Sequence, residues 1–89
     1  MPKKYPPLTP REVIEILTFR GFVLDRTSGD HRNYVRETRQ GEKTVTVDMG
    51  IDVFDDELIK SMIRQSGLSY EDFYCSTTTT AKKINRRMR

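Results

Sequence analysis

The sequence lacks the features that mark membrane, secreted and disulfide-bonded proteins. No apolar run approaches the roughly 18 to 20 residues that cross a bilayer, and the first ten residues have charges without the apolar segment of a secretory signal. The one cysteine, Cys75, can neither form an internal disulfide nor build a metal site by itself. With 89 residues, we expect one small soluble domain in the cytoplasm, without a membrane partner.

The sequence also lacks the common motifs of cofactor-dependent and metal-dependent enzymes. It contains no Gly-rich phosphate loop, no paired metal-ligand spacing and no Cys/His pair. The chain has one histidine, His31, whose imidazole is the side chain best suited to proton transfer near pH 7. It follows Gly29-Asp30, a turn sequence, and begins a predicted strand, so it can project from the sheet edge into solvent. We therefore expect no cofactor and no metal.

The basic charge lies at the C-terminal end. The net charge is +3, but residues 75–89 have five basic residues and no acidic residue, so the first 74 residues carry −2. The isoelectric point of about 9.2 is thus set by this segment rather than by the predicted domain. Composition indicates a flexible or marginally helical basic tail over residues 75–89, with RNA, a protein partner or nothing as its contact.

A first helix is predicted directly after an extended leader over residues 1–8. Thr9 can cap it, Pro10 suits its first position, and Glu12 can reach back to complete a capping box. The apolar spacing continues to residue 20, and Gly21 is a typical C-terminal stop.

A second helix is predicted after Asp55 or Asp56, either of which can be its N-cap, and Gly67 ends it. Acidic residues in its first turn favour the helix dipole. Its predicted buried stripe consists of Leu58, Ile59, Met62 and Ile63. Residues 69–73 predict one further helical turn, capped by Ser69.

Three short strands are predicted between these helices. Residues 22–27 and 31–37 are rich in strand-forming residues, and residues 43–48 alternate cleanly between Val and Thr. The turn residues 28–30 and 39–42 separate them, which indicates an antiparallel meander.

The expected fold is therefore α+β, with the order α-β-β-β-α. Because each helix has one apolar face, we expect both helices on one face of a three-stranded antiparallel sheet, with the other face open. Double-stranded-RNA-binding domains have this architecture.

Several motifs in this order resemble the HicA-type (YcfA-like) toxin family. The resemblance covers residues 9–74, which we take as the domain, and it rests on Gly21-Phe22-Val23, Gly29-Asp30-His31-Arg32-Asn33-Tyr34, Val45-Thr46-Val47, the helix 58–68 and the acidic-aromatic segment 69–73. It implies the fold expected above and the toxin of a type II toxin–antitoxin system that cleaves mRNA.

The resemblance also implies the site and the partners. The family's catalytic histidine corresponds to His31, and its preceding glycine corresponds to Gly29. It implies RNA as substrate and a HicB-like antitoxin that covers the active site, with a monomer when free and a hetero-oligomer with the antitoxin.

Metal-independent RNA cleavage can use a single histidine together with a helper group, because RNA carries its own nucleophile, the 2′-hydroxyl. A neutral imidazole can take the hydroxyl proton, an imidazolium can protonate the leaving oxygen, and water or a second residue must assist. The expected cations for the developing charge, all from predicted strands or their ends, are Arg26, Arg32, Arg36 and Lys43. The alternative is a non-catalytic RNA- or protein-binding module of the same fold.

Overall fold

The computed structural model describes residues 4–85 and has the predicted α+β class. The sheet is antiparallel with the order β1-β2-β3, so the expected meander is confirmed. In chain order the elements are α1 (Pro10–Phe19), β1 (Val23–Ser28), β2 (His31–Thr38), β3 (Gly41–Asp48), α2 (Asp56–Ser66), α3 (Tyr70–Tyr74) and α4 (Thr78–Asn85).

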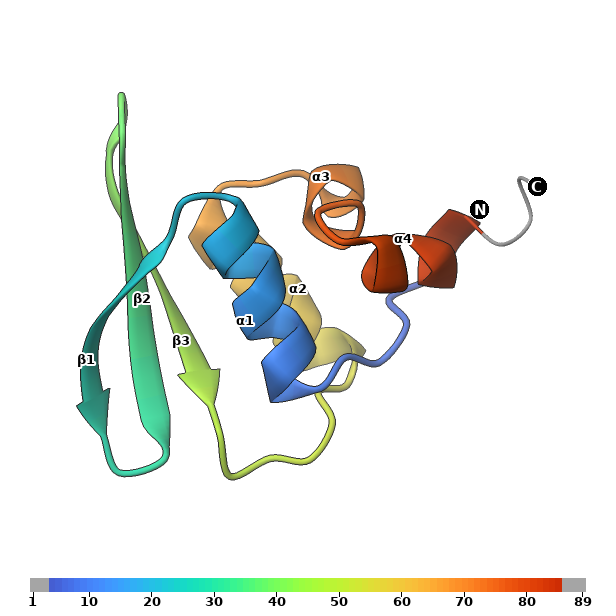
Figure 1. The fold of residues 1–89 in the computed structure, drawn as a ribbon, viewed down its shortest axis with the longest axis horizontal. Coiled ribbons are helices and arrows are strands. Elements are labelled where there is room, and N and C mark those ends of the chain that lie inside the picture. Colours follow the sequence, from blue (N-terminus) through green and yellow to red (C-terminus); the bar gives the residue numbers. More distant parts are fainter. Residues whose placement is uncertain (1–3, 86–89) are drawn as a thin grey trace.

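The elements form two layers. Figure 1 shows the sheet on one side and all four helices on the other, so that one face of the sheet is left uncovered by the described residues. The core lies between the layers, since burying each apolar helix face against the sheet removes both from water. Its fully or almost fully buried residues are Leu8, Val13, Ile16, Leu17, Phe22, Tyr34, Val45, Val47, Phe54, Ile59, Met62, Phe73 and Tyr74.

The helix ends follow the predicted capping chemistry. In α1 the Thr9 hydroxyl accepts from the Glu12 N–H at 3.2 Å, while the Glu12 carboxylate accepts from the Thr9 N–H at 2.9 Å. In α2 the Asp55 carboxylate accepts from the Leu58 N–H, and Gly67 ends the helix with φ +77°. These local contacts fix where the helices begin and end, and so where the strands between them can pair.

The predicted buried stripe of α2 is wrong at Leu58, whose residue is 40% exposed. The reason is that α2 lies beside the free edge of β3, where the Gln65 side-chain oxygen accepts from the Thr46 backbone N–H at 3.3 Å. Ile59 and Met62 face the core from this position, whereas Leu58 faces the space next to the sheet edge.

The segment that the sequence predicts as a flexible or marginally helical tail contains α4. Thr80, in α4, is fully buried, and its hydroxyl donates to the Tyr74 carbonyl at 2.6 Å. Lys83 donates to the Pro7 carbonyl at 3.1 Å. These partners lie outside α4 itself, so the amphipathic pattern of this segment alone does not reveal them. Residues 86–89, which hold part of the predicted basic tail, lie outside the described residues.

The predicted leader is also joined to the fold. Leu8 is fully buried, and its carbonyl accepts from the Phe54 N–H at 2.8 Å, just before α2. The Tyr74 hydroxyl donates to the Pro6 carbonyl at 2.7 Å. The division of the chain into leader, domain and tail stays a prediction.

Candidate functional site

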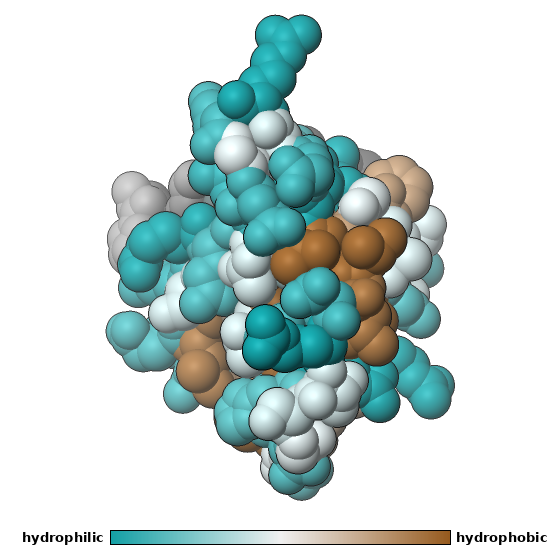
Figure 2. Space-filling model, turned by 90° about the vertical axis from the view of Figure 1, so that its left-hand side faces the viewer, coloured by the Kyte–Doolittle hydropathy of each residue, from teal (hydrophilic) through white to brown (hydrophobic). Residues whose placement is uncertain are grey.

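The uncovered face of the sheet collects side chains from all three strands. In the β2–β3 pairing His31 lies opposite Asp48, and Asn33 lies opposite Thr46. Because side chains alternate between faces, these four residues lie on the face opposite the buried Tyr34. Figure 2, which views the molecule from the side of the sheet, shows hydrophilic surface interrupted by apolar areas, one of them near the centre of the view.

His31 is positioned by the turn between β1 and β2. Ser28 pairs with His31, which leaves Gly29 and Asp30 as a two-residue loop. Gly29 has φ +59°, a left-handed conformation that the first central position of such a turn requires. The predicted Gly29 therefore serves the turn that places His31 at the start of β2. A Cβ at Gly29 would meet nothing within 4 Å, so the backbone there is open to solvent.

A carboxylate faces the imidazole. The His31 Nε2 atom lies 3.6 Å from the Asp48 Oδ2 atom, and the His31 side chain is 58% exposed. The other Asp48 oxygen accepts from the Gly50 N–H at 2.9 Å, which fixes the carboxylate. The separation exceeds a hydrogen-bond length, so Asp48 faces the ring without holding it.

The loop after β3 is joined to the turn before β2. The Met49 N–H donates to the Asp30 carbonyl at 2.6 Å. A Cβ at Gly50 would come within 2.9 Å of an Asp30 carboxylate oxygen and 3.3 Å of an Asp48 carboxylate oxygen. The absence of a side chain at Gly50 thus allows the Asp30 and Asp48 carboxylates both to approach the Gly50 backbone.

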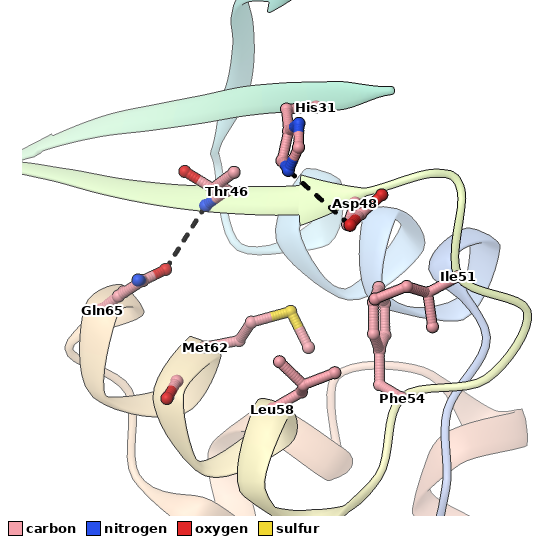
Figure 3. Close-up of a pocket in the computed structure, with 9 residues that line it drawn as sticks. His31, Thr46, Asp48, Ile51, Phe54, Leu58, Met62 and Gln65 are labelled. Carbon is pink, nitrogen blue, oxygen red and sulfur yellow. Dashed lines mark hydrogen bonds and ion pairs between the residues drawn. The ribbon is translucent and has the colours of Figure 1, made fainter. Parts of the chain in front are cut away.

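A cleft of about 210 Å³ opens beside these groups, between the edge of β3 and α2. In Figure 3 the apolar side chains of Leu58, Met62 and Phe54 converge below His31 and Asp48, and Gln65 borders the other end. The lining residues are His31, Thr46, Asp48, Ile51, Phe54, Leu58, Ser61, Met62 and Gln65. The cleft therefore joins a proton-transfer group to an apolar floor.

Of the four predicted cationic residues, the structure brings Arg26 to the face of His31. Arg26 pairs with Asn33, and its side chain is 74% exposed beside Asp25, with 3.8 Å between the charged groups. A bulge between Leu24 and Arg26 sets this register.

The other three predicted cations lie on the helix-covered face. Arg32 and Arg36 alternate with His31 along β2, and Lys43 is paired with Arg36. Arg36 donates to the Arg20 carbonyl at 3.0 Å, and its guanidinium lies 5.4 Å from the centroid of the Phe22 ring. These contacts give Arg36 a role in packing.

Sequence reasoning did not single out Asp48, Gln65 or Ser61 for the site. Asp48 ends the alternating third strand, and its place opposite His31 depends on the register of the β2–β3 hairpin, which the sequence leaves open. Gln65 and Ser61 share one side of α2 with Leu58, at helical spacing. That spacing was the signal that could have found them.

The pronounced pKa shift among the described residues lies away from this cleft. Burial raises the pKa of the Tyr74 phenol well above its usual value, with a smaller contribution from Tyr70. Within residues 4–85 no group of three or more His, Cys, Asp or Glu side chains is arranged to hold a metal ion. No helix of that range is long and apolar enough to cross a membrane.

A comparison with protein-family models gives a match. The family model described as the HicA toxin of bacterial toxin–antitoxin systems matches residues 10–68, about two thirds of the chain. This range includes all three strands, α1, α2 and every residue that lines the cleft. A comparison with curated proteins gives no match.

Proposed function

The chain belongs to the HicA toxin family, and we propose that it is an endoribonuclease that cleaves mRNA through His31 without a metal ion. Toxins of this family are generally RNases that act in toxin–antitoxin systems. The observation that carries the proposal is the position of His31, exposed on the open sheet face, beside Asp48 and at the border of a cleft.

The chemistry follows from the substrate. The His31 imidazole takes the proton of an RNA 2′-hydroxyl, whose oxygen then forms a bond to the adjacent phosphorus. The bond from phosphorus to the 5′-oxygen breaks, and that oxygen receives a proton from water or from the imidazolium. The products are a 2′,3′-cyclic phosphate and a 5′-hydroxyl, so no step needs an outside nucleophile.

Asp48 supports this chemistry in the proposal. Its Oδ2 atom, 3.6 Å from Nε2, faces the positive charge that the ring gains when it takes the proton. The Gly50 N–H fixes the opposite carboxylate oxygen, so this orientation is set before RNA binds. Asp48 thus stabilises the imidazolium by its charge, without the hydrogen bond by which a carboxylate orients the histidine of other acid–base sites.

The proposed contacts to phosphate differ between the predicted cations. Arg26 shares the face of His31 and is the cation whose position best suits the developing negative charge. Gly29 offers backbone open to solvent in the turn that precedes His31. Arg32 and Lys43 lie on the helix-covered face, so RNA would have to pass around the sheet edge to reach them. Arg36 already donates a hydrogen bond to the Arg20 carbonyl.

Family membership implies a toxin–antitoxin partnership. We propose a HicB-like antitoxin as the partner, covering the open sheet face and therefore His31. Binding there would block RNA by occupying the surface on which the substrate lies. The free toxin is proposed to be a monomer and the complex a hetero-oligomer, both in the cytoplasm.

The test is cleavage of a long single-stranded RNA in EDTA by the wild type and by His31→Ala. We expect the wild type to produce 2′,3′-cyclic phosphate ends and the variant to lose about 10²- to 10⁴-fold in rate. Thermal unfolding should match between the two proteins, because His31 is exposed. Equal cleavage by both would overturn the role of His31. Binding of RNA without cleavage by either would favour a non-catalytic module.

A further inference from the structure

We propose that the cleft beside His31 holds one unstacked base of the RNA strand, next to the phosphate that is cleaved, and that the protein therefore requires single-stranded RNA. This rests on the proposed function and adds to it the site that positions the substrate. The cleft is continuous with His31 and Asp48, so a base in it would bring the neighbouring ribose to the imidazole.

The floor of the cleft suits a flat heterocycle. Leu58, Met62 and Phe54 provide apolar surface, and Figure 3 shows them pointing into the space beneath His31. A volume of about 210 Å³ lies below the roughly 300 to 1,000 Å³ of sites that hold whole drug-sized ligands. The cleft thus matches a fragment of ligand, such as one base, rather than a complete nucleotide chain.

The negative charge around the cleft favours a neutral base over a phosphate as its occupant. Asp48 lines it, Asp30 lies beside Asp48 near Gly50, and Asp55 precedes α2. A phosphate placed inside would face the like charge of the Asp48 carboxylate at short range, whereas a neutral base would not. The base therefore enters the cleft while the phosphates stay outside, on the side of the open face where Arg26 lies.

The free edge of β3 is poorly suited to a peptide at this point. A strand added to that edge would need the Thr46 N–H, which already donates to the Gln65 side chain at 3.3 Å. Ser61 adds a hydroxyl to the wall, a group that can donate to or accept from any base. These observations favour a base over an extended segment of a protein partner.

Single-strand selectivity follows from the place of the cleft beside the sheet, between β3 and α2. A base paired and stacked in a duplex cannot enter a side cleft unless it is extruded, which costs unstacking energy. Contacts of a base with apolar and aromatic side chains tolerate all four bases, because each has a π-face. The cleft should therefore select unpaired RNA while discriminating weakly between bases.

The direct test is a titration of 15N-labelled protein with adenosine 5′-monophosphate, followed by NMR amide shifts. Ribose 5-phosphate, which lacks the base, is the matched ligand control. We expect shifts at Ser61, Gln65 and Thr46 with the nucleotide and none with the sugar phosphate. Ser61→Phe fills the cleft and should abolish them. Thr79→Phe, the same kind of change on an exposed position of α4, should leave them in place.

A cleavage assay gives the second readout. An oligonucleotide with an abasic ribonucleotide next to the cleaved phosphate should lose at least about fivefold in kcat/KM relative to the intact strand. Ser61→Phe should cleave both at the same reduced rate, and Thr79→Phe should behave as the wild type. A duplex of the same sequence should resist the wild-type protein.

The outcomes separate the two proposals. If RNA is cleaved but the base makes no difference in either assay, the base site is refuted and the catalytic proposal stands. If no RNA is cleaved, the catalytic proposal fails, and the NMR titration still decides whether the cleft binds a base. Shifts caused equally by ribose 5-phosphate would overturn the inference. Loss of antitoxin binding by Ser61→Phe, without any nucleotide shift, would assign the cleft to the protein partner.

Discussion

The two faces of the sheet differ more than any other two regions of this molecule. On β2, Tyr34 is 6% exposed and packs into the core, while His31, on the opposite face, has a side chain that is 58% exposed. The same alternation separates Arg36, held by Arg20, from Asn33, which pairs with Thr46. On β2 the even-numbered positions thus face the helices, and the odd-numbered positions face the open side, where the candidate His31 lies.

This comparison shows why a basic strand is a poor guide to RNA contact. Arg26, Arg32, Arg36 and Lys43 are equivalent by charge, but the register divides them between the faces. A guanidinium on the covered face is used for packing, and its removal affects folding. A guanidinium on the open face is solvated, and its removal affects binding. Neighbouring substitutions should therefore have different consequences.

The largest expected difference in the free energy of unfolding is that between Tyr34→Ala and Asn33→Ala. Truncating the buried ring should lower the free energy of unfolding by about 3 to 5 kcal/mol. Asn33 loses only an exposed hydrogen bond to Thr46, so its variant should change by less than about 1 kcal/mol. Urea unfolding measures both. Losses of similar size would mean that the two faces do not differ in this way.

Arg36→Ala should lower the free energy of unfolding by about 1 to 3 kcal/mol, because it removes the bond to the Arg20 carbonyl and the contact with Phe22. Cleavage per folded molecule should stay the same. Arg39→Ala, at the exposed hairpin, is the matched control and should leave stability unchanged. If Arg36→Ala folded normally but bound RNA weakly, Arg36 would belong with the open face.

Tyr74 belongs to the core on the covered side of the sheet, and burial raises the pKa of its phenol. The folded state therefore keeps the phenol proton after the unfolded state loses it, so the free energy of unfolding should fall as pH rises above about 10. The contribution of this group to the slope should grow as pH rises past about 10 and approach about 1.4 kcal/mol for each pH unit. Tyr74→Phe should reduce the slope by that amount in urea titrations between pH 9.5 and 11. An unchanged slope would place the phenol in contact with solvent.

The smallest effect on folding is expected for Arg26→Ala, within about 0.5 kcal/mol of the wild type. Its effect should appear in RNA binding instead. If Arg26 contacts one phosphate of a single strand, the slope of log affinity against log salt should decrease by about 0.7. Fluorescence anisotropy at several salt concentrations measures this slope. A slope equal to that of the wild type would remove Arg26 from the binding surface.

The element order was predictable because its signals are local. The capping box at Thr9 and Glu12, the stop at Gly67 and the Val–Thr alternation of the third strand each act within a few residues. The same holds for the turn at Gly29, which places the candidate His31 at the start of β2.

The rest depended on contacts between distant residues. Asp48 faces His31 only because the β2–β3 hairpin has a particular register, and Leu58 is exposed only because α2 lies beside the edge of β3. The grouping of all four cations in one site ignored the alternation along β2, a signal that the sequence did contain. The burial of Thr80 depends on a carbonyl six residues away, beyond what composition shows.

The joining of Pro7 to Lys83 has a practical consequence for handling this protein. The two ends of the described chain meet on the helical side, far from the open sheet face in Figure 1. Affinity tags or reporter proteins attached at either end would extend away from the cleft. A short linker between the ends, with a new opening at the exposed Arg39–Gln40 hairpin, would give a circular permutant with the same open sheet face.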